Sequence, residues 1–150
     1  MRLIIQNAIN ASCEVNNEIV GSISHGFVVL VGFTHSDNEA LVEKMAKKML
    51  SIRVFEDENH KTNLSLKDVD GKILSISQFT LYGSVKDGRR PSFVDALEPV
   101  EAKRLYLYFN DCLRKEGYIV KEGIFGADMK ISLINDGPFT LIIDSKELNL

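Results

Sequence analysis

A polar stretch interrupts the apolar pattern of the chain at Ser77–Leu81, where a strand ends. Alternation along a strand puts Ser77 and Phe79 on one face and Gln78 and Thr80 on the other. In one interpretation the hydroxyls simply bond to backbone, as Ser and Thr often do at strand ends. In the other, this strand end presents hydroxyls, an amide and backbone N–H groups to a ligand, and such donors can stabilise an oxyanion.

Two other segments carry residue types suited to binding. Gly137–Pro138 lies between two expected strands and forms either a plain tight hairpin or a rigid backbone wedge whose carbonyls face a ligand. Glycine keeps such a wedge thin because it has no Cβ. Lys86, Arg89 and Arg90 surround Asp87, a local balance of +2. This run is either a solvated loop or a phosphate contact, for which paired arginines are well suited.

Several chemistries lack their usual sequence patterns. The chain has no Gly-x-Ser-x-Gly elbow, no Gly-rich nucleotide loop and no histidine close to Ser77 or Thr80 in sequence. Its three histidines have no metal-binding spacing, and Cys13 and Cys112 form no Cys-x-x-Cys pair. We therefore expect no metal and no cofactor, and a hydrolase of this sequence need not use a side-chain triad.

The elements that must position these residues are mostly strands. Period-2 patterns and turn residues predict strands near 3–11, 18–23, 27–34, 53–57, 72–79, 118–124, 129–135 and 139–144. Asn16-Asn17 is a turn signal, and the second and third of these strands are expected to form a hairpin around Ser24–Gly26. Residues 80–92 are expected to form an irregular loop.

Two helices are expected. The first follows a capping box at Ser36–Glu39 and buries Leu41, Met45, Met49 and Ile52. The second starts at Pro99, stops at Gly117 and buries Ala102, Leu105, Phe109 and Cys112. Strands and helices do not alternate regularly, which disfavours a doubly wound fold. The expected fold is α+β: a barrel-like, mostly antiparallel β-sheet with two outer α-helices, in one domain over residues 1–150.

Composition excludes several classes of protein. The 150 residues are 45% hydrophobic and 26% charged, which disfavours a disordered or fibrous chain. Eighteen basic and 21 acidic residues give a net charge of −3, unlike a simple basic nucleic-acid binder, although a local patch can still bind RNA. The longest apolar run, Phe27–Val31, is too short to cross a membrane, and residues 1–15 hold no signal-peptide core. The expected location is the cytoplasm.

The chain resembles the D-aminoacyl-tRNA deacylases, small dimeric esterases that proofread tRNA. The similarity runs from Met1 to about Ser145 and depends on segments that occur together in family order and spacing. These segments are Asn63–Leu66, Ser77–Leu81, Gly88–Phe93, Phe125–Met129 and Asn135–Pro138.

The resemblance implies a reaction, a partner and an assembly. The reaction is hydrolysis of the ester between a D-amino acid and the 3′ end of tRNA, with glycine mischarged on tRNA(Ala) as a second substrate. The assembly is a homodimer in which Gly137–Pro138, with a cis bond, enters the partner's pocket. Its carbonyls would exclude an L side chain there, a case of specificity by exclusion. No membrane or DNA partner is expected.

The resemblance also implies roles for particular residues. The strand end, which we take as the catalytic segment, would bind the aminoacyl ester with Ser77, Gln78, Phe79 and Thr80. Thr80 could act as a nucleophile. Alternatively, the protein only positions the substrate while the RNA's own 2′-hydroxyl assists, and the lack of a nearby base favours this second role. The substrate and its terminal adenosine would meet Phe125, Gly126, Ala127, Met129, Gly137 and Pro138, since bases stack on apolar surface. Lys86, Arg89 and Arg90 are our own candidates for tRNA phosphate.

The chain departs from the family pattern at Asn7, Thr62 and Phe139, where Arg, Met and a smaller residue are usual. Two other classes of function compete with the deacylase. A non-catalytic dimeric β-barrel could capture an aminoacylated or nucleotide ligand, which fits the lack of an obvious nucleophile–base pair. A purely structural dimer would leave Gly137–Pro138 and the polar strand end unexplained.

Overall fold

A long antiparallel hairpin forms the centre of the fold. In the computed structural model, which describes residues 1–148, β1 (Arg2–Val15) pairs along its length with β2 (Glu18–Gly32). Asn16 and Asn17 form the turn with φ of 51° and 65°, a left-handed conformation that Asn tolerates better than most residues. The turn signal at Asn16-Asn17 is therefore confirmed.

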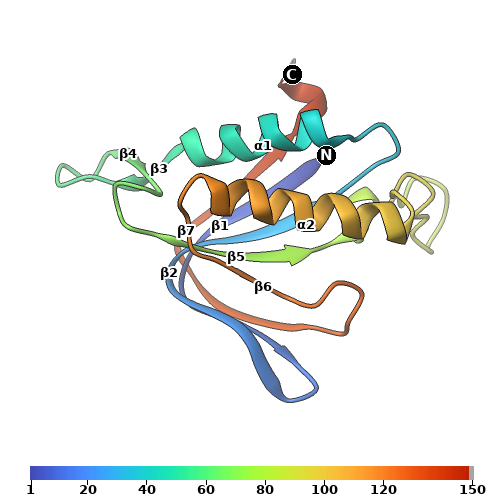
Figure 1. The fold of residues 1–150 in the computed structure, drawn as a ribbon, viewed down its shortest axis with the longest axis horizontal. Coiled ribbons are helices and arrows are strands. Elements are labelled where there is room, and N and C mark those ends of the chain that lie inside the picture. Colours follow the sequence, from blue (N-terminus) through green and yellow to red (C-terminus); the bar gives the residue numbers. More distant parts are fainter. Residues whose placement is uncertain (149–150) are drawn as a thin grey trace.

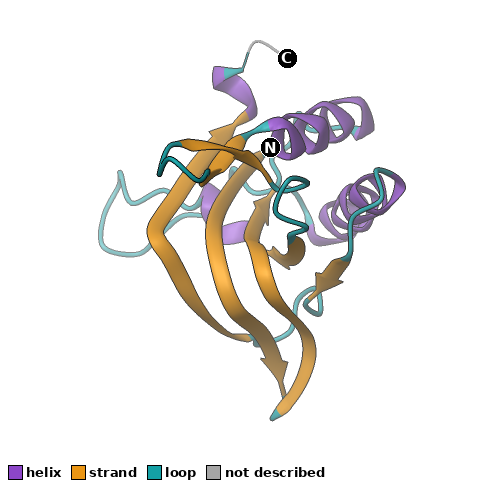
Figure 2. Ribbon diagram, turned by 90° about the vertical axis from the view of Figure 1, so that its left-hand side faces the viewer, coloured by secondary structure: helices purple, strands orange, loops and turns teal. Residues whose placement is uncertain are grey.

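Five strands form the main sheet, in the order β6–β5–β2–β1–β7. β7 (Lys130–Asp144) pairs with β1 antiparallel, whereas β5 (Lys72–Ser77) pairs with β2 and β6 (Val120–Glu122) parallel. The long pairings are thus antiparallel. The sheet curves strongly along its length (Figure 2). β3 (Arg53–Glu56) and β4 (Thr62–Ser65) form a separate small ribbon.

Both long helices lie on one side of this sheet (Figures 1 and 2). α1 (Glu39–Ser51) and α2 (Pro99–Lys115) bury an apolar stripe against Leu3, Ile5 and their neighbours in the larger core cluster. The expected α+β class with two outer helices is confirmed. The prediction of a capping box at Ser36 was wrong. The N-cap of α1 is Asn38, whose Oδ1 accepts a hydrogen bond from the backbone N–H of Leu41.

Two strand predictions were wrong, and one strand was missed. Ser24–Gly26 is not a turn, because β2 runs straight through it. Gly26, at φ 138°, lets β2 pass so close to β5 that a Cβ would lie 1.9 Å from the Lys72 carbonyl oxygen. The strands expected at 129–135 and 139–144 are one strand, β7, and β4 had no strand signal.

Two short 3-10 helices complete the part of the chain that the structure describes. η1 (Phe79–Tyr82) follows β5 directly, so part of the expected loop at 80–92 is helical, and η2 (Ser145–Glu147) follows β7. Within residues 1–148, neither α1 nor α2 has the length and apolar character needed to cross a membrane.

Candidate functional site

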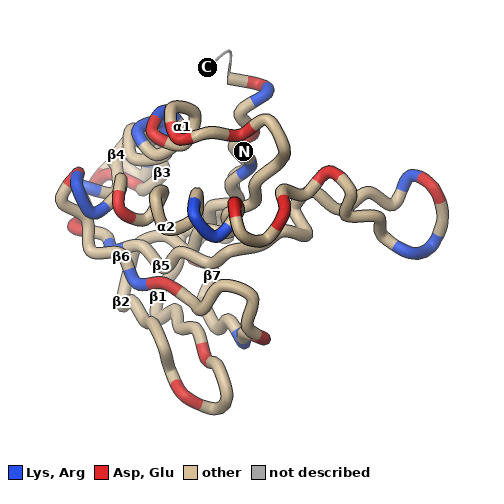
Figure 3. The backbone as a smooth tube through the Cα atoms, turned by 45° about the vertical axis from the view of Figure 1, so that its right-hand side comes forward, with Lys and Arg blue, Asp and Glu red and all other residues tan. Residues whose placement is uncertain are grey.

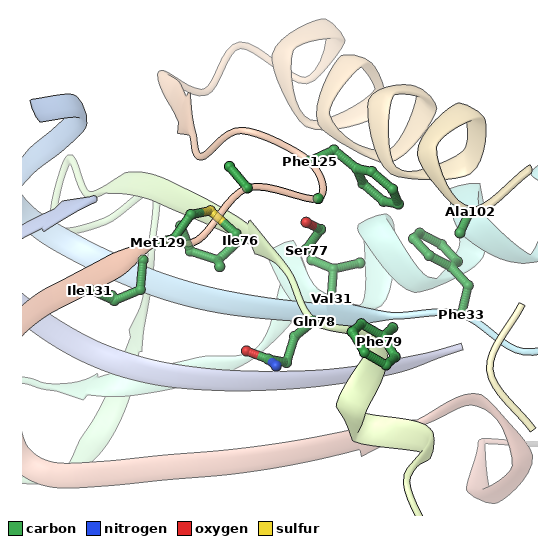
Figure 4. A pocket seen from close by; sticks show the side chains of 12 residues that line it. Val31, Phe33, Ile76, Ser77, Gln78, Phe79, Ala102, Phe125, Met129 and Ile131 are labelled. Atoms are coloured by element: carbon green, nitrogen blue, oxygen red, sulfur yellow. The ribbon is translucent and has the colours of Figure 1, made fainter. Parts of the chain in front are cut away.

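A hollow of about 270 Å³ opens where β5 ends, beneath the segment that joins β6 to β7 (Figure 4). It combines the strand end with that segment and with apolar residues of β2, α2 and β7. Its lining is Val31, Phe33, Ile76, Ser77, Gln78, Phe79, Ala102, Phe125, Gly126, Ala127, Met129 and Ile131. The structure therefore brings together seven of the ten residues predicted to be catalytic or substrate-binding.

Backbone pairing fixes the strand end. Ser77 lies opposite Val31 in the parallel register, and the backbone N–H of Gln78 donates to the Val31 carbonyl (2.8 Å). The chain then turns into η1, whose position is fixed by Arg2: Nη1 donates to the Leu81 carbonyl (2.5 Å). Ser77 faces Phe125 across the hollow, whereas Gln78 points to the other side of the strand (Figure 4).

The opposite wall is attached to the same strand. The Ser75 carbonyl accepts hydrogen bonds from the Gly123 amide (3.1 Å) and from the buried Tyr106 hydroxyl (2.8 Å) of α2. Tyr106 also packs on Phe125 with ring centroids 6.0 Å apart. These contacts hold Phe125 over Ser77 and set the width of the hollow.

The polar chemistry of this lining is sparse. Thr80 is exposed and outside the lining, and its hydroxyl accepts a hydrogen bond from the side-chain amide of Gln78. Within residues 1–148, no carboxylate, imidazole or ammonium group lines the hollow. Burial raises the pKa of the nearby Cys13 thiol, so that group is not a thiolate at neutral pH. Among the described residues, His, Cys, Asp and Glu nowhere gather in a group of three that could hold a metal ion.

Gly137 and Pro138 are absent from this lining. They sit in a bulge of β7 opposite Asn7, where Gln6 pairs with Thr140 and Ala8 with Asn135. The bond between them is cis, and Asn135 Oδ1 accepts the Phe139 amide (2.9 Å) across the bulge.

Gly137 lines a second hollow, of about 470 Å³. Asn7, Thr62 and Phe139, the three positions that depart from the family pattern, line it too. Asn7 is 6% exposed, and its Nδ2 donates to the Val54 carbonyl while its Oδ1 has no partner in the described chain. The three residues that differ from the family pattern therefore lie together, in the hollow beneath the bulge.

The three residues of the basic run lie in two different surroundings. It belongs to a loop that stands away from the body of the molecule and carries basic residues near its tip (Figure 3). Arg89 and Arg90 are exposed and make no ion pair within residues 1–148. Lys86 instead lines a third hollow, at the base of that loop.

The sequence did not single out the apolar half of the lining. In the sequence, three of these residues have the pattern of core positions in alternating strands: Val31, Phe33 and Ile131. Ala102 belongs to the buried stripe that predicts α2. The pairing of Val31 with Ser77 would have identified that wall, but strand register is not visible in a single sequence.

Fold and hollow together define an α+β protein with a largely apolar pocket at a strand end. Comparison with known proteins identifies its family. The family model for D-Tyr-tRNA(Tyr) deacylase matches residues 4–144. A D-aminoacyl-tRNA deacylase of Bacillus cereus (strain B4264) is 53% identical over 146 residues, which cover 97% of this chain and 100% of that protein.

Solved structures agree with this match. One, of a c-Myc DNA unwinding element binding protein, has a TM-score of 0.90 at 37% identity and covers 96% of this chain and 98% of that one. Another, of a probable eukaryotic D-amino acid tRNA deacylase, has a TM-score of 0.82 at 21% identity over 95% and 97% of the two chains, which shows the fold alone. The chain belongs to the D-Tyr-tRNA(Tyr) deacylase family, whose enzymes are hydrolases.

Proposed function

We propose that this protein hydrolyses the ester of D-aminoacyl-tRNA, releasing the free D-amino acid and tRNA. The observation that carries the proposal is the hollow that joins Ser77, Gln78 and Phe79 to the segment Phe125–Met129. Both segments were expected to meet the substrate. They lie side by side in the fold although about 45 residues, roughly a third of a typical domain, separate them in sequence. The full chain, residues 1–150, would act as one deacylase domain in the cytoplasm.

The lining fits the end of a charged tRNA. Phe125, held by Tyr106, offers an aromatic face on which the terminal adenine can stack. Ser77 places its hydroxyl at one end of an otherwise apolar hollow, where the ester would lie. A site of this kind orients a ligand with few polar contacts.

The reaction proposed here needs no protein nucleophile. Water attacks the ester carbonyl, the bond to the ribose oxygen breaks, and that oxygen takes up a proton. The hollow lacks a side-chain base, so the neighbouring 2′-hydroxyl of the RNA assists while the protein positions the ester. Donors at the strand end stabilise the oxyanion.

We further propose that the active form is a homodimer. Gly137 lies outside the hollow of its own chain, so a wedge at the ester would have to come from a second copy. β7, which carries this residue, is an edge strand of the sheet. Ile134 and Ile142 on it are 57% and 60% exposed, which marks an apolar edge suited to a partner.

Chirality would follow from exclusion. Backbone carbonyls of the partner's bulge would occupy the space of an L side chain and leave D side chains free to point outward. Glycine has no side chain to exclude, so glycyl-tRNA(Ala) would also be cleaved. The protein would then act in translation quality control.

A deacylation time course on matched D- and L-tyrosyl-tRNA tests the proposal. We expect catalytic turnover of the D ester and little loss of the L ester beyond the uncatalysed rate. Equal rates for the two would contradict chiral proofreading. A non-catalytic binder would instead protect the ester in proportion to protein, with no turnover.

A further inference from the structure

A third hollow, of about 570 Å³, lies at the far end of η1 from the candidate active site. Segments distant in sequence form its walls: the start of β1, the loop after η1, the residues around Thr34 and the start of η2. The lining is Arg2, Thr34, Tyr82, Gly83, Ser84, Val85, Lys86, Asp95 and Lys146. Neither the proposed reaction nor the comparisons account for it.

The charges around this hollow favour an anion. Three cations, Arg2, Lys86 and Lys146, face one acid, Asp95, so the lining has a balance of +2. Arg2 is already paired with Asp144, through Nε (2.9 Å) and Nη2 (2.7 Å). The two lysines make no ion pair within the described residues, and both are exposed, so their charge is available to a ligand.

Tyr82 forms an uncharged part of the wall. Tyr82 is 7% exposed, and its hydroxyl has no hydrogen-bond partner in the part of the chain that the structure describes. Burial, and then the carboxylates of Asp37 and Asp144, raise the pKa of this phenol, so it keeps its proton. The hydroxyl oxygen is closed to solvent, so Tyr82 shapes the wall of the hollow as an uncharged residue and does not present a donor to a ligand.

The hollow is adjacent to the candidate active site. Phe79 lines the active-site hollow and Tyr82 lines this one, and both belong to η1. At about 2 Å of rise per residue in a 3-10 helix, the two Cα atoms are roughly 6 Å apart along the axis. Each nucleotide of a duplex strand advances about 3.4 Å along the helix axis, so two nucleotides cover this separation. One strand can therefore reach both hollows.

We propose that this hollow binds a backbone phosphate of the RNA strand whose aminoacylated end occupies the candidate active site. Lys146 and Lys86 supply the charge, and Ser84 supplies a hydroxyl group. Arg2 ties the two sites together, because it lines this hollow and also holds the Leu81 carbonyl of η1. The proposal rests on the proposed function, since the RNA is its substrate.

A charge-neutralising pair of variants tests the site. Lys146→Gln removes a cation from the hollow, and Lys121→Gln makes the same change on β6, at the opposite edge of the sheet. Each is measured on D-tyrosyl-tRNA and on D-tyrosyl-adenosine, which has no backbone phosphate. Thermal unfolding confirms that both variants are folded.

For Lys146→Gln we expect the ratio of kcat/KM on tRNA to kcat/KM on the adenosine ester to fall about fivefold at 0.1 M salt. The slope of log kcat/KM against log salt should become shallower by about 0.7, the value of one single-strand phosphate contact. Lys121→Gln should retain the wild-type ratio and slope. If the two variants behave alike, the proposal is overturned.

Inorganic phosphate separates an RNA phosphate from a free anion. We expect millimolar phosphate to compete with D-tyrosyl-tRNA in the wild type, less so in Lys146→Gln, and to leave D-tyrosyl-adenosine hydrolysis unchanged. A phosphate effect on the adenosine ester would assign the hollow to a free anion and overturn the RNA assignment. A wild type that turns over neither ester would defeat the proposed function itself.

Discussion

Thr80 carries a hydroxyl beside the candidate active site, but its surroundings do not activate it. The side chain is exposed and accepts a hydrogen bond from the Gln78 amide, which is a donor and not a base. A serine or threonine nucleophile needs an adjacent base to become reactive. The geometry therefore favours a positioning role for this segment.

Replacing Thr80 with Ala should reduce kcat on D-tyrosyl-tRNA by less than about tenfold, whereas loss of a true nucleophile would cost on the order of 10⁴. Single-turnover deacylation with Thr80→Ser as the matched control measures the difference. A tRNA ending in 2′-deoxyadenosine should lose more activity on the wild type than the mutation does. A loss near 10⁴ with intact folding would instead identify a hydroxyl nucleophile.

At the level of single residues, the sequence predicted the polar and glycine-containing half of the pocket lining. Ser77 and Gln78 stood out because polar residues interrupt an apolar strand, and Phe125–Met129 because they matched a family segment. Val31 and Ile131 did not stand out, since a pocket wall and a core share the same composition. Their role depends on where the strands lie next to each other.

β5 positions the pocket through its parallel pairing with β2, and Gly26 makes that pairing possible. Gly26→Ala places a Cβ 1.9 Å from the Lys72 carbonyl oxygen at a φ of 138°. We expect a loss of about 3 kcal/mol in the free energy of unfolding, the combined cost of overpacking and backbone strain.

Gly88→Ala is the control for Gly26→Ala. Its φ of 114° is also positive, but nothing lies within 4 Å of the added Cβ, so we expect only about 1 kcal/mol. Urea unfolding of both variants gives the two values. Equal losses would show that backbone conformation alone, and not the contact with β5, makes this glycine necessary.

Elements with local signals were predictable, and those set by long-range pairing were not. Helix α2 was found from Pro99 and its apolar stripe, since both act within a few residues. The supposed hairpin at Ser24–Gly26 failed because a glycine that signals a turn also permits close strand packing. The bulge at Gly137–Pro138 was expected to separate two strands, because a break in one ladder resembles a turn in sequence.

The whole molecule exposes an apolar edge strand, which a monomer would leave open to water. We expect a homodimer, for which light scattering at micromolar concentration should give about twice the chain mass of 16.8 kDa. Ile142→Lys on β7 should shift the mass toward that of one chain, and Ile119→Lys, outside the strands, should not. A fully active monomer would count against the shared site.

The proposed shared site makes a stronger prediction, because the proposed wedge and the pocket can be damaged separately. Gly137→Ala places a Cβ 2.9 Å from the Phe139 amide nitrogen at a φ of 131°, so the bulge must shift. A displacement of about 1 Å near reacting groups can cost 100-fold, and we expect a loss of that order in kcat/KM on D-alanyl-tRNA. Ala127→Phe fills the pocket and should be inactive while leaving its own bulge intact.

Mixing and reannealing these two inactive proteins decides where the wedge acts. If it acts across the dimer, each mixed dimer contains one site with an intact pocket and an intact wedge. Random pairing then restores about a quarter of the wild-type sites, because half of the dimers are mixed and each has one good site. The restored activity should show the wild-type preference for D- over L-alanyl-tRNA and should accept glycyl-tRNA. If the wedge acts within its own chain, every site in the mixture has one damaged part, and no activity returns.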